Sequence, residues 1–99
     1  MRVQVDENTL REIQKMILRP VTDIFDDVND IVQFIKDKGL FGIDTEELQK
    51  KLLEADKEME QFMTRVVDYD KYYPNEYRVY IFKIKVNSKT YYVVSTAVS

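Results

Sequence analysis

The spacing of the apolar residues changes once along the chain, close to Pro74. Before this point apolar residues recur at intervals of three or four, as they do along one face of an α-helix, in a series that begins Leu10, Ile13, Ile17, Val21, Ile24, Val28, Ile31 and Ile35. After it apolar residues occupy alternate positions, which is typical of a β-strand, as at Tyr80, Phe82, Ile84 and Val86. The two patterns in one short chain predict an α+β fold.

The first helical series predicts a helix over residues 7–37 that is kinked or broken at Pro20. Proline has no N–H to donate to the carbonyl group of Met16, and its ring crowds that turn of the helix. The apolar face keeps its phase across the proline. A kinked continuous helix and two helices that meet at residues 18–20 therefore both satisfy the pattern.

The segment KDKGLFGIDTEEL predicts the end of one helix and the start of the next. Gly39 fits the left-handed position that follows a helix, with Leu40 folding back onto the preceding turn. Asp44 fits an N-cap, and Glu47 three residues later completes a capping box. The second helix is expected over residues 44–73, where intervals of three or four recur at Leu48, Leu52, Ala55, Met59, Phe62, Val66, Tyr69 and Tyr73. Two helices joined by so short a turn pack antiparallel as a helical hairpin.

The remaining segments predict the sheet. Residues 77–98 are expected to form an antiparallel β-hairpin, but the turn NSK lacks the glycine of a tight turn, so the pattern leaves the register open. Residues 1–6 contain the alternating run RVQV and predict a short strand that joins the hairpin as a third strand, with Asp6 or Asn8 capping the helix that follows. The expectation is a single domain, ordered β-α-α-β-β, in which a long helical hairpin packs on a small antiparallel sheet.

The composition removes most catalytic chemistry. The chain of 99 residues contains no cysteine and no histidine, so it lacks thiol nucleophiles, the usual general base and the commonest zinc ligands. Asp68 and Asp70 do not begin a calcium loop, because Tyr72 and Tyr73 stand where an oxygen ligand and a glycine are required. We therefore expect no catalytic residue, no metal, no cofactor and no small-molecule substrate, and we expect that the protein is not an enzyme.

Charge is distributed unevenly along the chain. The whole chain has a net charge of -3, whereas residues 20–68 hold thirteen acidic and six basic residues and residues 69–99 hold two acidic and five basic ones. A sheet that carries lysines for phosphate groups and tyrosines for base stacking is a known way to bind nucleic acid. This pattern defines a candidate binding surface, which consists of Lys71, Tyr72, Tyr77, Arg78, Lys83, Lys85 and Lys89. In the competing interpretation Tyr80 and at least one of Tyr91 and Tyr92 pack in the core. The acidic helical half is then an ordinary solvated surface, and a separate alternative is that it mimics nucleic acid.

Association with another protein is the function that the sequence favours. The predicted hairpin offers an edge strand with aromatic residues, and tyrosine is enriched in protein interfaces. A second copy of the chain would cover apolar surface that so small a core leaves over. We therefore expect a non-catalytic protein that acts by protein–protein association as a homodimer, with nucleic-acid binding by the C-terminal hairpin as the alternative.

No stretch of the sequence approaches the roughly 20 apolar residues that cross a bilayer, and the N-terminus lacks the apolar region of a secretory signal, so an intracellular protein is expected. As a short charged chain without Cys, His or Trp, with Glu- and Lys-bearing helices and a hairpin rich in Tyr, Val and Ile, it resembles the small orphan proteins of filamentous and rod-shaped viruses of thermophilic archaea. The resemblance lies in composition and involves no motif, so no functional residue is carried over. It implies a heat-stable viral protein, often dimeric, in the host cytoplasm or associated with the virion.

Overall fold

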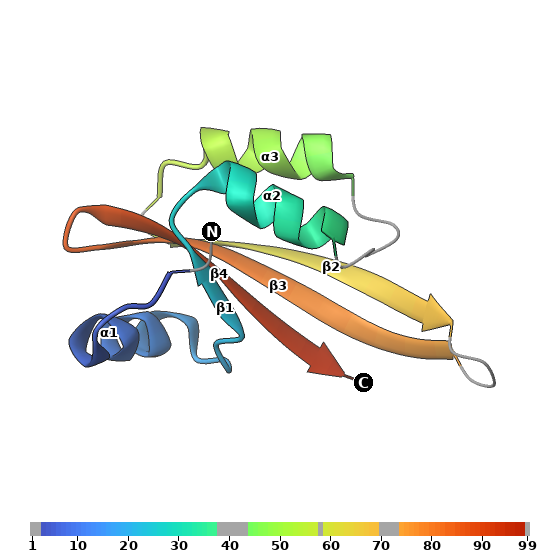
Figure 1. The fold of residues 1–99 in the computed structure, drawn as a ribbon, viewed down its shortest axis with the longest axis horizontal. Coiled ribbons are helices and arrows are strands. Elements are labelled where there is room, and N and C mark those ends of the chain that lie inside the picture. The colour runs from blue at the N-terminus through green and yellow to red at the C-terminus, as the bar shows by residue number, and fades with distance from the viewer. Residues whose placement is uncertain (1–2, 38–43, 58, 70–73, 99) are drawn as a thin grey trace.

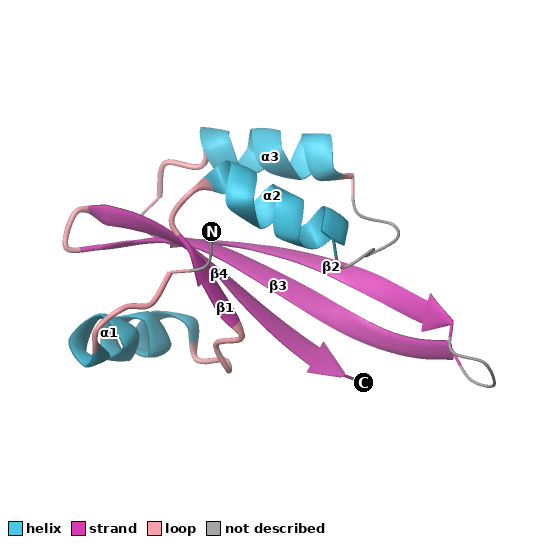
Figure 2. Cartoon of the chain, viewed as in Figure 1, coloured by secondary structure: helices cyan, strands magenta, loops and turns pink. Residues whose placement is uncertain are grey.

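The computed structural model describes residues 3–37, 44–57, 59–69 and 74–98, and it describes their side chains except at 63–69, 74–77 and 97–98. The elements in chain order are α1 (Glu7–Ile17), β1 (Asp23–Phe25), α2 (Val28–Asp37), α3 (Thr45–Glu54), β2 (Met59–Tyr69), β3 (Pro74–Val86) and β4 (Lys89–Val98). The strands form one antiparallel sheet in the order β1-β4-β3-β2, with α2 and α3 on one face and α1 on the other (Figures 1 and 2). The α+β class is therefore confirmed, in a three-layer arrangement.

Both faces of the central strands are buried, which explains why β3 and β4 are so apolar. The core on the α2–α3 side consists of Phe25, Ile31, Ile35, Leu48, Leu52, Val79, Ile81, Tyr92 and Val94. The core on the α1 side consists of Ile13, Ile17, Ile24, Tyr80, Phe82, Ile84, Val86, Tyr91 and Val93. The predicted alternation of β3 is correct in phase, and the interpretation that places its tyrosine Tyr80 in the core is confirmed, because Tyr80 is only 3% exposed.

Of the two alternatives for residues 7–37, a kinked continuous helix is wrong and a break near residues 18–20 is present, but a strand separates the two helices. α1 ends at Ile17, and Leu18 takes the left-handed conformation, with φ 52°, in which its N–H donates to the carbonyl of Gln14 at 3.2 Å. Pro20 then disfavours helical dihedrals at the residue before it. The proline therefore follows the end of a helix and does not kink one.

The chain between α1 and α2 joins the sheet. Thr22 donates its N–H to the carbonyl of Val94 at 2.8 Å, and β1 continues this pairing with β4. α2 begins where the carboxylate of Asp27 accepts a hydrogen bond from the N–H of Asn29 at 2.7 Å, which satisfies a free donor of the first helical turn. The apolar residues of this segment fit both the helical and the strand period, which is why the pattern suggested one continuous helix.

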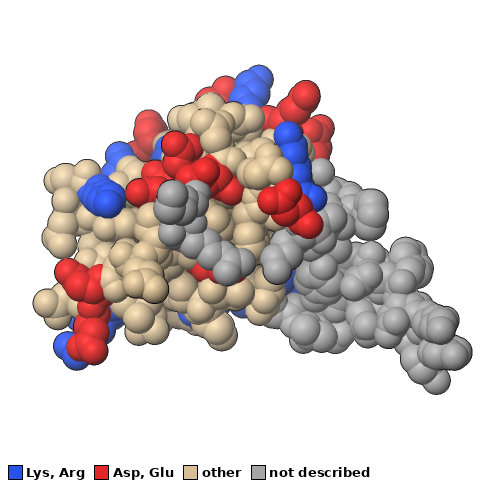
Figure 3. Space-filling view, in the orientation of Figure 1, with Lys and Arg blue, Asp and Glu red and all other residues tan. Residues whose placement is uncertain are grey.

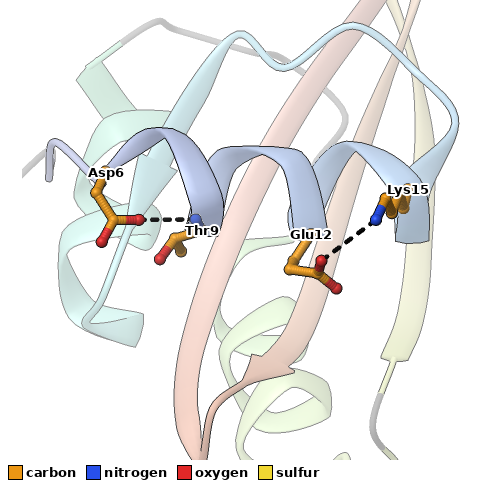
Figure 4. A network of polar contacts seen from close by, with 4 residues as sticks. All are labelled: Asp6, Thr9, Glu12 and Lys15. Atoms are coloured by element: carbon orange, nitrogen blue, oxygen red, sulfur yellow. Dashed lines mark hydrogen bonds and ion pairs between the residues drawn. The ribbon is translucent and has the colours of Figure 1, made fainter.

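The N-terminus of α1 is capped by Asp6, one of the two predicted caps. The carboxylate of Asp6 accepts a hydrogen bond from the N–H of Thr9 at 2.7 Å (Figure 4). This bond, together with one from the Thr9 hydroxyl group, lowers the pKa of Asp6 below its ordinary value. One turn further along, Lys15 Nζ lies 3.4 Å from Glu12 Oε1 on the exposed side of the helix (Figure 4).

The N-terminal strand predicted over residues 1–6 is absent from residues 3–6, and residues 1 and 2 lie outside the described residues. Val3 donates its N–H to the carbonyl of Ile24 at 2.9 Å. The order of elements in the described chain is therefore α-β-α-α-β-β-β, and the predicted order β-α-α-β-β is corrected.

The predicted helix over residues 44–73 ends after ten residues. α3 begins as predicted, since the carboxylate of Asp44 accepts a hydrogen bond from the N–H of Glu47 at 3.1 Å. The helix ends at Glu54, and β2 follows. The apolar residues of the segment MEQFMTRVVDY are spaced as in a helix, whereas its β-branched residues favour a strand. The segment forms a strand because its backbone pairs with β3. The helical pair is thus the short α2–α3 pair, and the predicted turn at 38–43 lies outside the described residues.

The hairpin of β3 and β4 has a continuous register. Asn87 and Ser88 form its two-residue turn with φ of 52° and 68°, the left-handed pair that a type I′ turn requires, so Val86 lies opposite Lys89. β3 extends back to Pro74 because it also pairs with β2. The paired ends of β2 and β3 project past the helices (Figure 1), and the longest dimension of the molecule is 45 Å.

Candidate interaction surface along the β2 edge

β2 is an edge strand of the sheet. In the order β1-β4-β3-β2 it has a strand neighbour on one side only within the described chain, and it runs for 11 residues. A long edge strand presents a row of unpaired N–H and C=O groups, which is a template for pairing with another chain. The apolar spacing of this segment predicted a helix, so its position at the edge of the sheet was not expected from the sequence.

The register identifies which backbone groups of β2 face outward. In an antiparallel ladder, opposed residues alternate between pairs that exchange hydrogen bonds and pairs that do not. Val86 and Lys89 flank the two-residue turn and form a hydrogen-bonded pair, so the odd-numbered residues of β3 turn their backbone groups toward β2. The same rule makes the even-numbered residues of β2 bond to β3, while odd-numbered ones such as Gln61 turn their N–H and C=O outward. The bond from Thr22 to the carbonyl of Val94, on the far side of β4, fits this alternation.

An open hollow of about 510 Å³ lies where β2 begins, beside the C-terminal end of α3. Its lining consists of Lys51, Glu54, Ala55, Asp56, Lys57, Glu60, Gln61 and Phe62. Phe62 is half-buried and packs against the core beneath α2 and α3, whereas Met59 is 40% exposed. The start of β2 therefore combines unpaired backbone groups with apolar side chains that are partly exposed.

The α2–α3 layer is acidic. Acidic residues outnumber basic ones in these helices and in the residues that cap them, and Figure 3 shows acidic side chains over this layer. The ion pair between Lys51 and Glu47, 3.1 Å long, is exposed and adds at most about 0.5 kcal/mol. An acidic surface repels nucleic acid, so an anionic ligand would have to approach the opposite face of the sheet.

Lys83, a member of the predicted binding surface, lies inside the fold. Its side chain is 9% exposed, and its Nζ donates hydrogen bonds to the carbonyl oxygens of Leu52 at 2.7 Å and Ala55 at 2.8 Å. The last carbonyl groups of a helix have no partner within the helix, and a cation also suits the negative end of the helix dipole. Lys83 therefore holds the end of α3 on the sheet and is not available to a ligand.

The three other predicted binding residues whose side chains the structure describes do not all lie on one face of the sheet. Arg78, Lys85 and Lys89 are exposed, but alternation along β3 places Arg78 on the α1 side of the sheet and Lys85 on the α2–α3 side. The Nζ of Lys89 lies 5.3 Å from the ring centre of Tyr91. Three members lie outside what the structure describes, namely Lys71, Tyr72 and the side chain of Tyr77.

Arg19 is a surface cation that the sequence analysis did not select. Its guanidinium carbon lies 3.8 Å from the ring centre of Tyr80, which is a cation–π contact. Arg78 stands two residues from Tyr80 on the same face, and the register places Arg78 opposite Arg65 of β2. Within the described residues Arg78 forms no ion pair and no side-chain hydrogen bond. No local signal could have joined these residues, because Arg19 and β3 are far apart in the sequence.

Among the residues that the structure describes, no group of three or more acidic side chains is placed to hold a metal ion. None of the helices in that part of the chain is long and apolar enough to cross a membrane. In comparisons with known proteins, no protein-family model, no curated protein and no solved structure matches this chain. The resemblance to archaeal viral proteins therefore stays a prediction, and the geometry of the fold is the basis for a functional proposal.

Proposed function

We propose that this protein is non-catalytic and acts by protein–protein association, forming a homodimer through the outer edge of β2. The observation that carries the proposal is an 11-residue strand at the edge of the sheet with no strand neighbour on its outer side within the described chain. Pairing with another strand satisfies the outward N–H and C=O groups and continues the sheet from one copy into the next.

A second copy of the chain supplies a matching edge. Two identical strands pair antiparallel about a two-fold axis, so each outward group meets an equivalent group of the partner. Strand addition draws its affinity from backbone hydrogen bonds and therefore does not require a strongly apolar strand. Met59, the first residue of β2, is 40% exposed, and covering it adds a hydrophobic contribution.

Gln61→Pro tests the proposal. Because the N–H of Gln61 faces outward, proline at this position removes a bond to the partner but none to β3, and edge strands tolerate proline there. We expect light scattering over a concentration series to show a dimer for the wild type and a monomer for Gln61→Pro, with unchanged circular dichroism. The matched control, Gln61→Thr, keeps the N–H, suits a strand and remains a dimer. A wild type that is monomeric at every concentration, or a dimeric Gln61→Pro variant, contradicts the proposal.

Nucleic-acid binding is the second candidate, and the arginines on the α1 side of the sheet favour it. Arg19 stacks on Tyr80, and Arg78 lies on the same face opposite Arg65. Arg19 and Arg78 take the place of the predicted lysine surface in this candidate, because Lys83 is buried and cannot contact a ligand.

Arg19→Glu with Arg78→Glu tests this second candidate. We expect the double variant to lose retention of labelled single strands that the wild type retains at low salt. Wild-type affinity is expected to fall by roughly 0.7 log units per neutralised phosphate for each log unit of salt. Lys85→Glu, an exposed change on the other face, serves as the control and retains binding. Absence of any wild-type binding at low salt eliminates the candidate.

A further inference from the structure

We infer that the two-fold axis of the homodimer passes through Phe62, so that this residue lies directly opposite the partner's Phe62. The inference rests on the proposed function, because it specifies how two β2 edges align. It follows from three properties of β2: which face each residue occupies, where its charges lie, and which backbone groups are already used by β3.

The continuity of the sheet limits the registers that two β2 strands can adopt. Directly opposed residues of antiparallel strands lie on the same face of the sheet. Phe62 packs on the α2–α3 side and lies opposite Ile81, which belongs to the core on that side, so the even-numbered residues of β2 face α2 and α3. Even-numbered residues therefore pair with even-numbered ones, and the two-fold axis passes through a residue and not between two. From the middle of β2 at Thr64 toward the hollow at its start, the candidates are Thr64, Met63 and Phe62.

Charge disfavours an axis at Thr64. This axis overlaps the two strands along their whole length, but it sets Glu60 opposite the partner's Asp68, and symmetry repeats the pair. Carboxylates directly opposed on neighbouring strands are destabilising. An axis at Phe62 sets Glu60 opposite the partner's Thr64 and creates no like-charged pair within the paired strands.

The aromatic ring favours an axis at Phe62 over one at Met63. The backbone groups of Phe62 are used by β3, so Phe62 and the partner's Phe62 form a pair that exchanges no hydrogen bonds, in which the two side chains are closest. Two half-buried phenyl rings then cover each other's exposed surface. An axis at Met63 would instead set Phe62 opposite the partner's Thr64.

The hollow beside β2 leaves room for this arrangement. With the axis at Phe62, the partner's strand continues past its own Thr64 alongside Glu60 and the residues that precede it. The hollow of about 510 Å³ is lined by Glu60, Gln61 and the end of α3, so it lies where the partner's strand has to pass.

Single-cysteine variants test the register, because the chain contains no cysteine of its own. A disulfide across the dimer forms only where the two Cβ atoms lie about 3.5–4.5 Å apart. After oxidation we expect Phe62→Cys to migrate mostly as a covalent dimer on a non-reducing gel. Met63→Cys and Thr64→Cys, which report the two rival axes, are expected to remain monomeric on the gel.

A second variant keeps the aromatic ring in place. Glu60→Cys with Thr64→Cys is expected to form a covalent dimer while Thr64→Cys alone does not, because the axis at Phe62 joins position 60 to position 64 of the partner. Cross-linking of Thr64→Cys alone or of Met63→Cys overturns the register but leaves the homodimer standing. A wild-type dimer in which none of these variants cross-links places the interface elsewhere and overturns both the register and the β2 edge. A wild type that is monomeric by light scattering removes the proposed function and this inference with it.

Discussion

Lys83→Met is the substitution for which the structure predicts the clearest effect on stability. Methionine keeps the length of the side chain but removes the charge and both hydrogen bonds, which join Nζ to the carbonyl oxygens of Leu52 and Ala55 at 2.7 and 2.8 Å. A hydrogen bond to a charged group contributes about 1.5–3 kcal/mol net, and the carbonyl groups regain water only in part because Lys83 is 9% exposed. Since methionine retains most of the packing, we expect the free energy of unfolding to fall by about 2–4 kcal/mol.

Urea denaturation and thermal melting followed by circular dichroism measure this loss. A change of 1 kcal/mol shifts the Tm of a domain of this size by about 4–8 °C, so the Tm of Lys83→Met is expected to fall by at least about 8 °C. Lys85→Met is the matched control, because Lys85 lies two residues along the same face of β3 and is exposed; its effect is expected to stay within about 0.5 kcal/mol. If the stabilities of Lys83→Met and the wild type agree within that margin, the bonds of Lys83 do not hold α3 on the sheet and the reasoning is refuted.

Three further predictions concern caps and titrating groups. Asp44→Ala removes the acceptor at the start of α3 and is expected to cost about 1 kcal/mol in urea denaturation; an unchanged midpoint would contradict the role of the cap. The hydrogen bonds from Thr9 lower the pKa of Asp6, so Asp6 stabilises α1 above the pKa that it has in the unfolded chain, and this contribution disappears as the pH falls through the lower folded pKa, below about pH 4. An NMR titration in which Asp6 has an ordinary midpoint would rule this out. Burial, and to a smaller extent the Asp27 carboxylate, raise the pKa of Tyr92 in the folded protein. The stability that neutral Tyr92 contributes is therefore complete below its pKa in the unfolded chain, near 10, and is lost as the pH rises through its higher pKa in the folded protein. Ultraviolet titration of the wild type against Tyr92→Phe is expected to show this tyrosine ionising late, and Asp27→Asn is expected to lower its midpoint; an early-ionising Tyr92 would refute the assignment.

The parts of the fold that were predicted correctly depend on neighbours in the sequence. Asp6 and Asp44 cap helices because the N–H groups that they bind lie within three residues. The alternation through Tyr80 placed the residues of β3 on their correct faces, because side chains of a strand alternate whatever the strand pairs with. Of the candidate binding residues, Arg78 and Lys85 are exposed, but alternation alone could not show that the two faces of β3 are covered by different helices.

The parts that were missed depend on contacts between distant segments. The segment MEQFMTRVVDY satisfies a helical and a strand pattern, and only the hydrogen bonds that β3 offers select the strand. The burial of Lys83 follows from the position of α3, whose last carbonyl groups need a donor that the helix itself cannot supply.

The sequence by itself therefore determined the α+β class, the cap at Asp44, the phase of β3 and the absence of thiol and imidazole chemistry, and it narrowed the first cap to Asp6 or Asn8. These features follow from residue identity and from local backbone geometry. Tertiary structure alone decided that β2 is a strand, that it lies at the edge of the sheet and that Lys83 is a structural cation. Strand order and burial depend on contacts between segments. The stability of a strand in its place comes from the backbone groups it pairs with and the side chains that cover it, and both belong to other stretches of the sequence.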